Sequence, residues 1–390
     1  MARGSIIKRS ENSYRVMVSY TNEFGKRVQV TKTAPSPTKA EKLKTALLAE
    51  IDKGTFVKPS KLTVKVYLEQ WLDGQVRSTV GDGTQELYTY LCKKHIIPAL
   101  GDIALGNLRP QHIQKLYSDK LIEGLSPRTV QLLHVALHKS LKCATRTGLL
   151  VRNPMDVVDQ PKVERHEMKT MTEDNIKLFL DKARNGDYYS LFFTLLFTGV
   201  RRGEALSLRW GDIDLLGAKL SVNRTMQFIN NQVSFKAPKT KSSRRQIDLS
   251  PATCAVLRLH REKMNGTREY MGLPLPTNGD LVFSHANGEP LLPNSVTHAW
   301  IKLRRRCNLD DVSLHGARHS HATILLKSGV SPKVIQERLG HASFSTTMNL
   351  YAHVSPGMQK AAANRFDDMV IGNSKDNCVT NPLPFDNPEK

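Results

Sequence analysis

The stretch that decides the fold runs from Ser313 to Val354 and reads SLHGARHSHATILLKSGVSPKVIQERLGHASFSTTMNLYAHV. His315 and Arg318 are three residues apart, which on a helix places both side chains on one face, one turn from each other. A second helix is predicted from Pro332 to Leu339, with Ser331 as its N-cap and proline in the first helical position. The stretch therefore predicts two consecutive helices that carry polar side chains at fixed spacings.

Two further features of this stretch are polar residues that no apolar pattern explains. His341 directly follows the second helix in the sequence Leu-Gly-His, and Tyr351 lies ten residues beyond it among polar neighbours. An HxxR spacing is common by chance, and a lone tyrosine is usually a half-buried core residue. Upstream, the sequence TGVRRGE places Arg201 just after a strongly apolar helix. The order and spacing of these side chains in one chain indicate an active site.

The composition indicates a polyanionic partner. Lys and Arg number 57 against 36 Asp and Glu in 390 residues, and the net charge of +21 is spread through the chain. Such an excess favours DNA, RNA or an anionic membrane surface as partner and says nothing about the fold. A chain of this length is expected to hold two or three domains.

The chain is expected to be soluble and intracellular. No run approaches the roughly 18 apolar residues of a membrane span, and the amino terminus leads to no apolar signal segment. The cysteines are odd in number and widely spaced, without a CxxC pair, so they predict neither a zinc site nor a disulfide framework. They are Cys92, Cys143, Cys254, Cys307 and Cys378.

Residues 1–58 predict a small basic module of strands and one helix. Apolar residues alternate with polar ones from Tyr14 to Tyr20, residues 22–26 supply a hairpin turn, and a helix begins near Thr38 in a capping box with Glu41. The segment holds 12 Lys and Arg against five Asp and Glu. We interpret it as a DNA-contacting module in preference to a merely solvated one. The candidate contacts are Arg15, Lys26, Arg27 and Lys32.

Residues 62–154 predict an all-helical region. An amphipathic helix capped by Thr63 is followed by helices from about Thr84 to Ile97, after Pro110 with Leu121 facing inward, and from Pro127. The last helix carries its basic side chains and histidines away from its apolar stripe, which solvent exposure alone would explain. These are His134, His138, Lys139, Lys142 and Arg146. A linker is predicted from Arg152 to Met168.

Residues 170–370 predict a mainly helical domain with a small antiparallel sheet. Helices are expected after Thr172, at 188–197, at 251–264 and at 294–306, and strands at 219–222, 225–228 and 246–249. A basic turn, APKTKSSRR, precedes the last strand. Periodicity is lost after Asn364, and residues 371–390 predict a flexible tail.

In this order and spacing, the polar residues of 313–354 and the TGVRRGE segment resemble the catalytic domain of tyrosine recombinases, the phage integrase family. The resemblance covers essentially the whole chain and is strongest in 190–355. It implies a multidomain α+β protein with an arm-type DNA-binding domain (1–58), a helical core-binding domain (62–154), a catalytic domain (170–370) and a tail (371–390).

The resemblance also implies the reaction, which is metal-independent DNA strand transfer through a 3′-phosphotyrosine. Arg201 and Arg318 match the two arginines that hold the phosphate, a role suited to a planar fork that is always charged. His315 matches the histidine that assists proton transfer, and His341 matches the one that hydrogen-bonds the phosphate. Tyr351 would be the nucleophile.

A lysine is expected as the general acid that protonates the leaving 5′-oxygen. The resemblance favours Lys239 and leaves phosphate-backbone binding to Lys241, but residues two apart on an extended strand point to the same side, so either lysine fits. Glu204 lies one turn from Arg201 and either orients its guanidinium or forms an ordinary surface pair. His319, His321 and His353 add imidazoles without a carboxylate or thiol at ligand spacing, so neither a metal nor another cofactor is expected.

The implied partners are double-stranded DNA attachment sites, further copies of the chain in a homotetramer, an excisionase and a DNA-bending host factor, in the cytoplasm of a bacterial host at its nucleoid and away from membranes. A phage or a conjugative transposon would carry such a chain. A type IB topoisomerase shares the constellation but lacks site specificity, and a transposase with three carboxylates has no matching acidic triad here. A non-enzymatic DNA-binding regulator would explain the charge alone.

Overall fold

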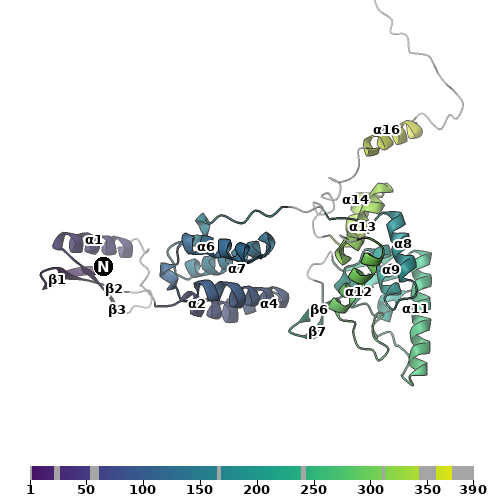
Figure 1. Cartoon of the computed structure of the whole chain (residues 1–390), viewed down its shortest axis with the longest axis horizontal. Coiled ribbons are helices and arrows are strands. Elements are labelled where there is room, and N and C mark those ends of the chain that lie inside the picture. The colour runs from purple at the N-terminus through teal and green to yellow at the C-terminus, as the bar shows by residue number, and fades with distance from the viewer. Residues whose placement is uncertain are drawn as a thin grey trace, which may run out of the picture. The chain divides into compact units, whose positions relative to one another are not determined.

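The computed structural model describes residues 2–21, 27–52, 61–164, 168–238, 243–309, 312–341 and 357–370. They form a mainly helical α+β structure with small antiparallel sheets near the amino terminus and in the carboxyl-terminal half, which confirms the predicted fold class. The chain divides into two units, Met1–His166 and Glu167–Lys390, and each is described by itself (Figure 1).

The first unit begins with a three-stranded antiparallel sheet that has one helix packed on one face. Its elements are β1 (Arg3–Ser10), β2 (Ser13–Thr21), β3 (Arg27–Ala34) and α1 (Pro37–Asp52). Val16 and Val18 are fully buried against the helix, which confirms the predicted alternation. The helix begins near Thr38 as predicted, but the predicted capping box is wrong, because the Ser36 hydroxyl accepts a hydrogen bond from the Lys39 amide and Thr38 already lies inside α1.

The rest of the first unit is helical, as predicted. Its α-helices are α2 (Val64–Trp71), α3 (Arg77–Thr79), α4 (Asp82–Leu91), α5 (Ile97–Leu100), α6 (Pro110–Ile122) and α7 (Pro127–Arg146). Thr63 and Ser126 cap α2 and α7 with their hydroxyl groups. Short 3₁₀ turns lie at Leu105–Asn107 and Pro154–Val157.

The helix expected from Thr84 to Ile97 lies within helical backbone that runs from Asp82 to Leu100 and includes a π-helical turn, Cys92–Ile96. A similar turn, Leu72–Val76, follows α2. Two local predictions in this region were wrong. Leu121 is 40% exposed, because α6 ends one residue later. His134 was expected in solvent but is buried, with Nδ1 3.1 Å from the Tyr117 hydroxyl oxygen.

The second unit is built around α9 (Tyr189–Thr198), which is apolar on nearly all sides and packs against helices on several sides. Its neighbours are α8 (Glu173–Ala183), α10 (Arg202–Ala205), α11 (Pro251–Tyr270), α12 (Pro293–Arg306), α13 (Leu314–Lys327) and α14 (Pro332–Leu339). Trp300 of α12 packs in the core with its ring centroid 4.4 Å from that of Phe179, in a tilted contact, and 5.3 Å from that of Phe192, edge to face. This core fixes the helices that carry the polar residues singled out above.

Small strands complete the second unit. One sheet has the order β4-β5-β8 and a hairpin joins β6 to β7. Their bounds are β4 (Ile213–Asp214), β5 (Lys219–Val222), β6 (Thr225–Ile229), β7 (Gln232–Lys236) and β8 (Arg245–Asp248). β7 was not predicted; its turn, Asn230-Asn231, has φ of 50° and 59°, the conformation of a two-residue hairpin turn that asparagine tolerates.

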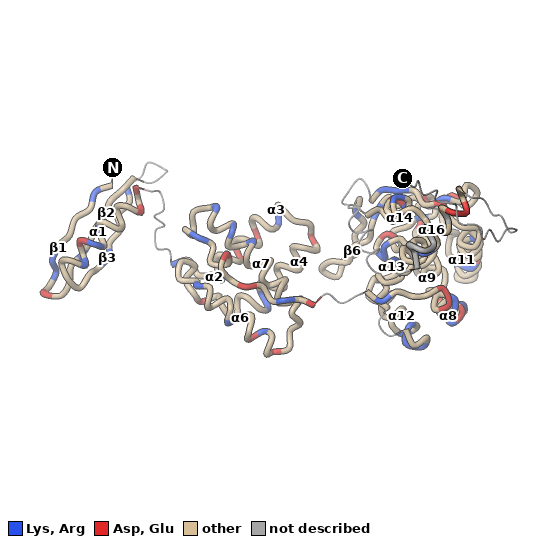
Figure 2. The backbone as a smooth tube through the Cα atoms, turned by 90° about the horizontal axis from the view of Figure 1, so that it is seen from above, with Lys and Arg blue, Asp and Glu red and all other residues tan. Residues whose placement is uncertain are grey.

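A last helix, α16 (Gly357–Val370), extends beyond Asn364, so the predicted loss of periodicity there was wrong. The expected tail, 371–390, lies outside the described residues. Cys92, Cys143, Cys254 and Cys307 are free thiols. Among the helices that the structure describes, none combines the length and the apolar character needed to cross a membrane. Lys and Arg occur on every part of the chain (Figure 2).

Candidate active site

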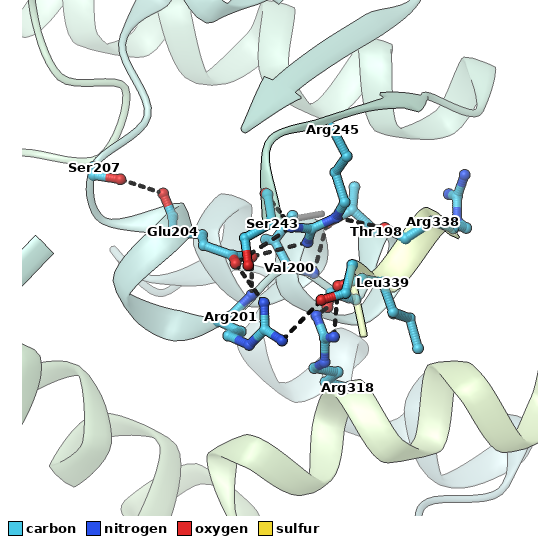
Figure 3. A network of polar contacts seen from close by, with 12 residues as sticks. Thr198, Val200, Arg201, Glu204, Ser207, Ser243, Arg245, Arg318, Arg338 and Leu339 are labelled. Carbon is cyan, nitrogen blue, oxygen red and sulfur yellow. Dashed lines mark hydrogen bonds and ion pairs between the residues drawn. The ribbon is translucent and has the colours of Figure 1, made fainter. Parts of the chain in front are cut away.

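Arg318 is the centre of the polar cluster that the fold assembles. The Ser313 hydroxyl starts α13 by accepting a hydrogen bond from the Gly316 amide, and Arg318 follows in the second turn with only 3% of its surface exposed. Its Nη1 donates to the Gly199 carbonyl at 2.8 Å, and its Nη2 donates to the Leu339 carbonyl at 2.6 Å. The guanidinium is therefore held between the carboxyl ends of α9 and α14 (Figure 3).

Glycines end both of these helices, and Gly199 leaves room for neighbouring side chains. Gly199 and Gly340 both adopt left-handed conformations, with φ of 66° and 65°, which end α9 and α14 and turn their last carbonyls outward. A side chain at position 199 would place its Cβ 2.5 Å from Leu339 Cδ2. Arg318 thus stabilises carbonyl groups that the helices themselves leave without partners.

Arg201 lies immediately before α10 and is bound to Glu204 twice. Its backbone amide donates to Oε2 at 2.9 Å, and its Nη1 donates to Oε1 at 2.7 Å. Its Nη2 donates to the Gly340 carbonyl at 3.2 Å, so both arginines hold the end of α14. The Arg201 side chain is 38% exposed while that of Glu204 is 4% exposed. Glu204 is therefore a buried carboxylate paired with a partly exposed guanidinium. Arg201 and Glu204 do not form an ordinary pair on the helix surface.

A second guanidinium, that of Arg245, binds the same carboxylate. Arg245 Nη2 lies 2.8 Å from Glu204 Oε2, and its Nη1 lies 3.3 Å from Oε1 (Figure 3). Burial raises the pKa of Glu204, but the hydrogen bonds and charges of Arg245 and Arg201 outweigh it and lower that pKa to about 2. The sequence interpretation missed Arg245, which it placed in a basic turn; its only signal was its position at the start of a predicted strand.

Histidines line the other side of the cluster. The rings of His315 and His319 meet edge to face with centroids 4.9 Å apart. Burial, with the charges of Arg318 and Arg201, lowers the pKa of His315. Burial also lowers the pKa of His319 and of His341 to about 4 in each case, helped by neighbouring charges. All three imidazoles are therefore neutral near pH 7 and can accept a proton or a hydrogen bond.

A cavity of about 420 Å³ opens between α10, α12 and the first turn of α13. Its wall combines two guanidinium groups of the cluster with an imidazole and the positive end of a helix dipole, a setting suited to an anion. The lining residues are Val200, Arg201, Arg202, Gly203, Thr297, Ser313, Leu314, His315 and Arg318. Arg202, which borders the cavity, donates from Nη1 to the Pro293 carbonyl of α12 at 3.2 Å.

Two family models match large parts of both units. Residues 169–358 match the model described as "Phage integrase family", and residues 63–121 match "Phage integrase, N-terminal SAM-like domain". The chain belongs to the phage integrase family of tyrosine recombinases. The first match contains every residue of the cluster described above.

Curated relatives include integrases, and solved integrase structures share the fold. The ICEBs1 integrase of Bacillus subtilis (strain 168) is 26% identical over 375 residues, covering 93% of this chain and 100% of that protein. The Tn1549 transposon integrase in complex with a circular intermediate DNA has a TM-score of 0.68 at 20% identity, covering 78% of this chain and 99% of that one. A lambda integrase tetramer bound to a Holliday junction has a TM-score of 0.58 at 18% identity, covering 88% and 94%.

The structure brings five of the predicted site residues of this integrase-family chain together. Arg201, Glu204, His315 and Arg318 lie in the cluster, and His341 is close enough that the charges of both arginines lower its pKa. Lys239, Lys241 and Tyr351 lie outside the described residues. Of the additional imidazoles, His321 binds the Leu196 carbonyl with Nδ1 at 2.9 Å and accepts from Arg338 Nε at 3.2 Å, a structural position. His353 also lies outside the described residues.

The predicted DNA contacts of the first unit fall on different surfaces. Arg15 pairs with Thr33 across the sheet, whereas Lys32 pairs with Val16, which is buried under α1. Directly paired residues share a face, so Arg15 and also Arg27, opposite Thr21, project from the open face, and Lys32 lies on the helix side. Lys26 lies outside the described residues.

Lys139 and Lys142 of α7 are exposed beside a groove of about 760 Å³ in the first unit. Residues of α2 and of the turn after it form the opposite wall. No group of three or more His, Cys, Asp or Glu side chains that could hold a metal occurs in the part of the chain that the structure describes.

Proposed function

We propose that this chain is a site-specific DNA recombinase that cleaves and rejoins DNA through a 3′-phosphotyrosine and so integrates and excises a mobile element. The observation that carries the proposal is the convergence of Arg201 and Arg318, distant in sequence, on one cavity of about 420 Å³ that His315 also lines. Family membership supports the same reaction class.

Both arginines retain donors for a phosphate. A guanidinium has five N–H groups, and each of these two uses one group on Nη1 and one on Nη2 for protein oxygens, which leaves three. The protein contacts fix each fork before substrate arrives. Fixed donors stabilise the charge that builds on the non-bridging oxygens without reorganising at the moment of reaction.

The remaining roles are assigned as follows. Tyr351 attacks phosphorus and becomes linked to the 3′-phosphate, with His315 assisting transfer of its proton. His341 donates a hydrogen bond to the phosphate. Lys239, or Lys241 in the alternative register, protonates the leaving 5′-oxygen. A 5′-hydroxyl of the partner strand then attacks the phosphotyrosine, which releases Tyr351 and rejoins the DNA.

DNA is held outside the catalytic cluster by two surfaces in this proposal. The open face of the β1–β3 sheet binds arm-type sites through Arg15 and Arg27, and the α7 face binds the core site through Lys139 and Lys142. Residues 1–58, 62–154 and 170–370 then act as arm-binding, core-binding and catalytic domains. Four copies exchange strands, with an excisionase and a DNA-bending host protein setting direction, in the cytoplasm of a bacterial host at its nucleoid. The Holliday-junction tetramer of the lambda integrase neighbour supports this assembly.

Covalent trapping tests the proposal. The chain is mixed with a duplex that carries the element's insertion junction and a nick beside the cleavage point, so that the small 5′-hydroxyl fragment diffuses away. We expect a protein–DNA adduct that resists denaturation and forms in EDTA. Tyr351→Phe removes only the hydroxyl, so it should bind the DNA as tightly and form no adduct.

Each alternative function predicts a different experimental result. A DNA-binding regulator would bind without any adduct. A topoisomerase would relax supercoiled plasmids that lack the junction sequence. A requirement for Mg²⁺ would place the chain among the carboxylate transposases.

A further inference from the structure

Arg245 is a buried guanidinium with three partner residues, all close to the catalytic cluster. Its side chain is 5% exposed and it binds both oxygens of Glu204. Its Nε donates to the Arg338 carbonyl in the last turn of α14 at 2.7 Å. Its Nη1 also lies 3.2 Å from the Ser243 carbonyl, just after the segment that contains Lys239 and Lys241.

The fold delivers Arg245 to this position through strand pairing. β8 runs antiparallel to β5, with Val222 opposite Arg245, and α14 packs against β8. Arg245 therefore connects a strand, the carboxylate next to Arg201 and the end of α14. The adjacent carbonyls of α14, those of Leu339 and Gly340, are the ones that Arg318 and Arg201 hold.

The charges of the cluster give Arg245 a second effect. Without Arg245, the buried carboxylate of Glu204 would have Arg201 as its single close cation and would offset the charge that Arg201 offers to a phosphate. With Arg245 present, two guanidinium groups bind the carboxylate while Arg318 binds backbone carbonyls, so the three arginines and one carboxylate carry a net charge of +2. In a site shielded from water, such charges act strongly on an anionic transition state.

We propose that Arg245 is a positioning residue for the cleavage step: it neutralises Glu204 and fixes that carboxylate against α14, so that Arg201 stays aligned and keeps its charge for the scissile phosphate. Arg245 contacts neither the cavity wall nor the DNA in this proposal, which rests on the proposed recombinase function. The effect of losing Arg245 should accordingly depend on whether Glu204 is charged.

The test compares single-turnover cleavage and DNA affinity for full-length wild type, Arg245→Gln, Glu204→Gln and the double variant. Arg245→Gln should cleave about 100-fold more slowly while its DNA affinity changes by less than about threefold. Glu204→Gln should cleave only about tenfold more slowly, because the amide oxygen still accepts from Arg201. The double variant should cleave at the same rate as Glu204→Gln, and therefore about tenfold faster than Arg245→Gln.

Arg268→Gln is the matched control. Arg268 is another buried arginine of the same unit, and it holds the Ala286 and Pro274 carbonyls at 2.9 and 3.0 Å, away from the cluster. Its loss should lower the melting temperature without changing the cleavage rate of the folded protein. If Arg245→Gln cleaves at the wild-type rate, or if the double variant is slower than both single variants, the inference is wrong.

The test also separates failure of this inference from failure of the proposed function. If wild type itself forms no adduct, the recombinase proposal fails first. If Arg245→Gln does not fold, the comparison of Glu204→Gln with the double variant still decides: equal rates support the inference, and a further large loss in the double variant overturns it.

Discussion

Arg318 of α13 and Lys142 of α7 are both cations assigned to DNA, but the protein holds them differently. Arg318 is 3% exposed and donates to two backbone carbonyls, whereas Lys142 is exposed on a helix surface. Fixing a guanidinium in one geometry suits the stabilisation of a particular transition state. An exposed ammonium exchanges with counterions on the DNA backbone and supplies affinity that depends on salt. The comparison suggests that Arg318 serves the cleavage reaction and that Lys142 serves DNA binding.

The largest effect is expected for Arg318→Lys. The ammonium keeps the charge but cannot reach the Gly199 and Leu339 carbonyls together and also present a fork to phosphate. Cleavage should fall about 100- to 1000-fold, with little change in DNA affinity. Single-turnover adduct formation and gel-shift titration measure the two quantities. If DNA affinity fell as much as the cleavage rate, Arg318 would serve DNA binding like an exposed cation, and the prediction would be wrong.

The next effect concerns the stability of the fixed cluster and its pH dependence. Removing the Glu204 charge leaves two guanidinium groups without their buried partner, so Glu204→Gln should lower the free energy of unfolding by about 3 kcal/mol at pH 7. The folded pKa of about 2 lies below the ordinary value of 4.5. The carboxylate's contribution is therefore complete above about pH 4.5 and is lost as pH falls toward 2.

Urea titrations at several pH values check this sign. The difference in unfolding free energy between wild type and Glu204→Gln should shrink between pH 4.5 and 2 and stay constant above pH 5. The low pKa values of His319 and His341, about 4 each, destabilise both proteins alike below pH 6.5 and so cancel in the difference. A difference that grows on acidification would contradict the assignment of Glu204 as a buried anion.

The same contrast explains what the sequence could predict. The helix starts at Thr63 and Thr172 depend on a hydroxyl and an amide three residues away, so the local sequence was enough to predict them. The pair of Arg201 and Glu204 is also local. Arg245 reaches Glu204 across 41 residues through strand pairing, and no local pattern marks it. His134 was misplaced for the same reason, because its partner Tyr117 lies on another helix.

A smaller effect is expected for the exposed cations of α7. Lys142→Gln should weaken DNA binding about tenfold at moderate salt and reduce the slope of log affinity against log salt by about one phosphate contact. The cleavage rate at saturating DNA should not change. Lys177→Gln is the control. Lys177 belongs to α8 of the second unit, its side chain is 77% exposed, and its Nζ lies 3.2 Å from Asp174 Oδ1. An unchanged salt slope in Lys142→Gln would remove α7 from the DNA-binding surface.

The smallest effect should come from the amino-terminal sheet, where two cations of the same strand pair project to opposite sides. Arg15 is opposite Thr33, on the face without a helix, whereas Lys32 is opposite Val16, which α1 covers completely. DNA that binds the open face would meet Arg15 and not Lys32. The two substitutions Arg15→Gln and Lys32→Gln each remove one charge and leave the sheet's pairing intact.

We therefore expect Arg15→Gln to weaken binding to an arm-type site about fivefold, with a salt slope lower by about one contact, and Lys32→Gln to change it less than about twofold. Cleavage at the core site should be the same in both variants. Footprinting of the arm site across a salt series gives both readouts. Equal losses would mean that the sheet contributes only its net charge, whereas a larger loss in Lys32→Gln would place the DNA on the helix side of the sheet.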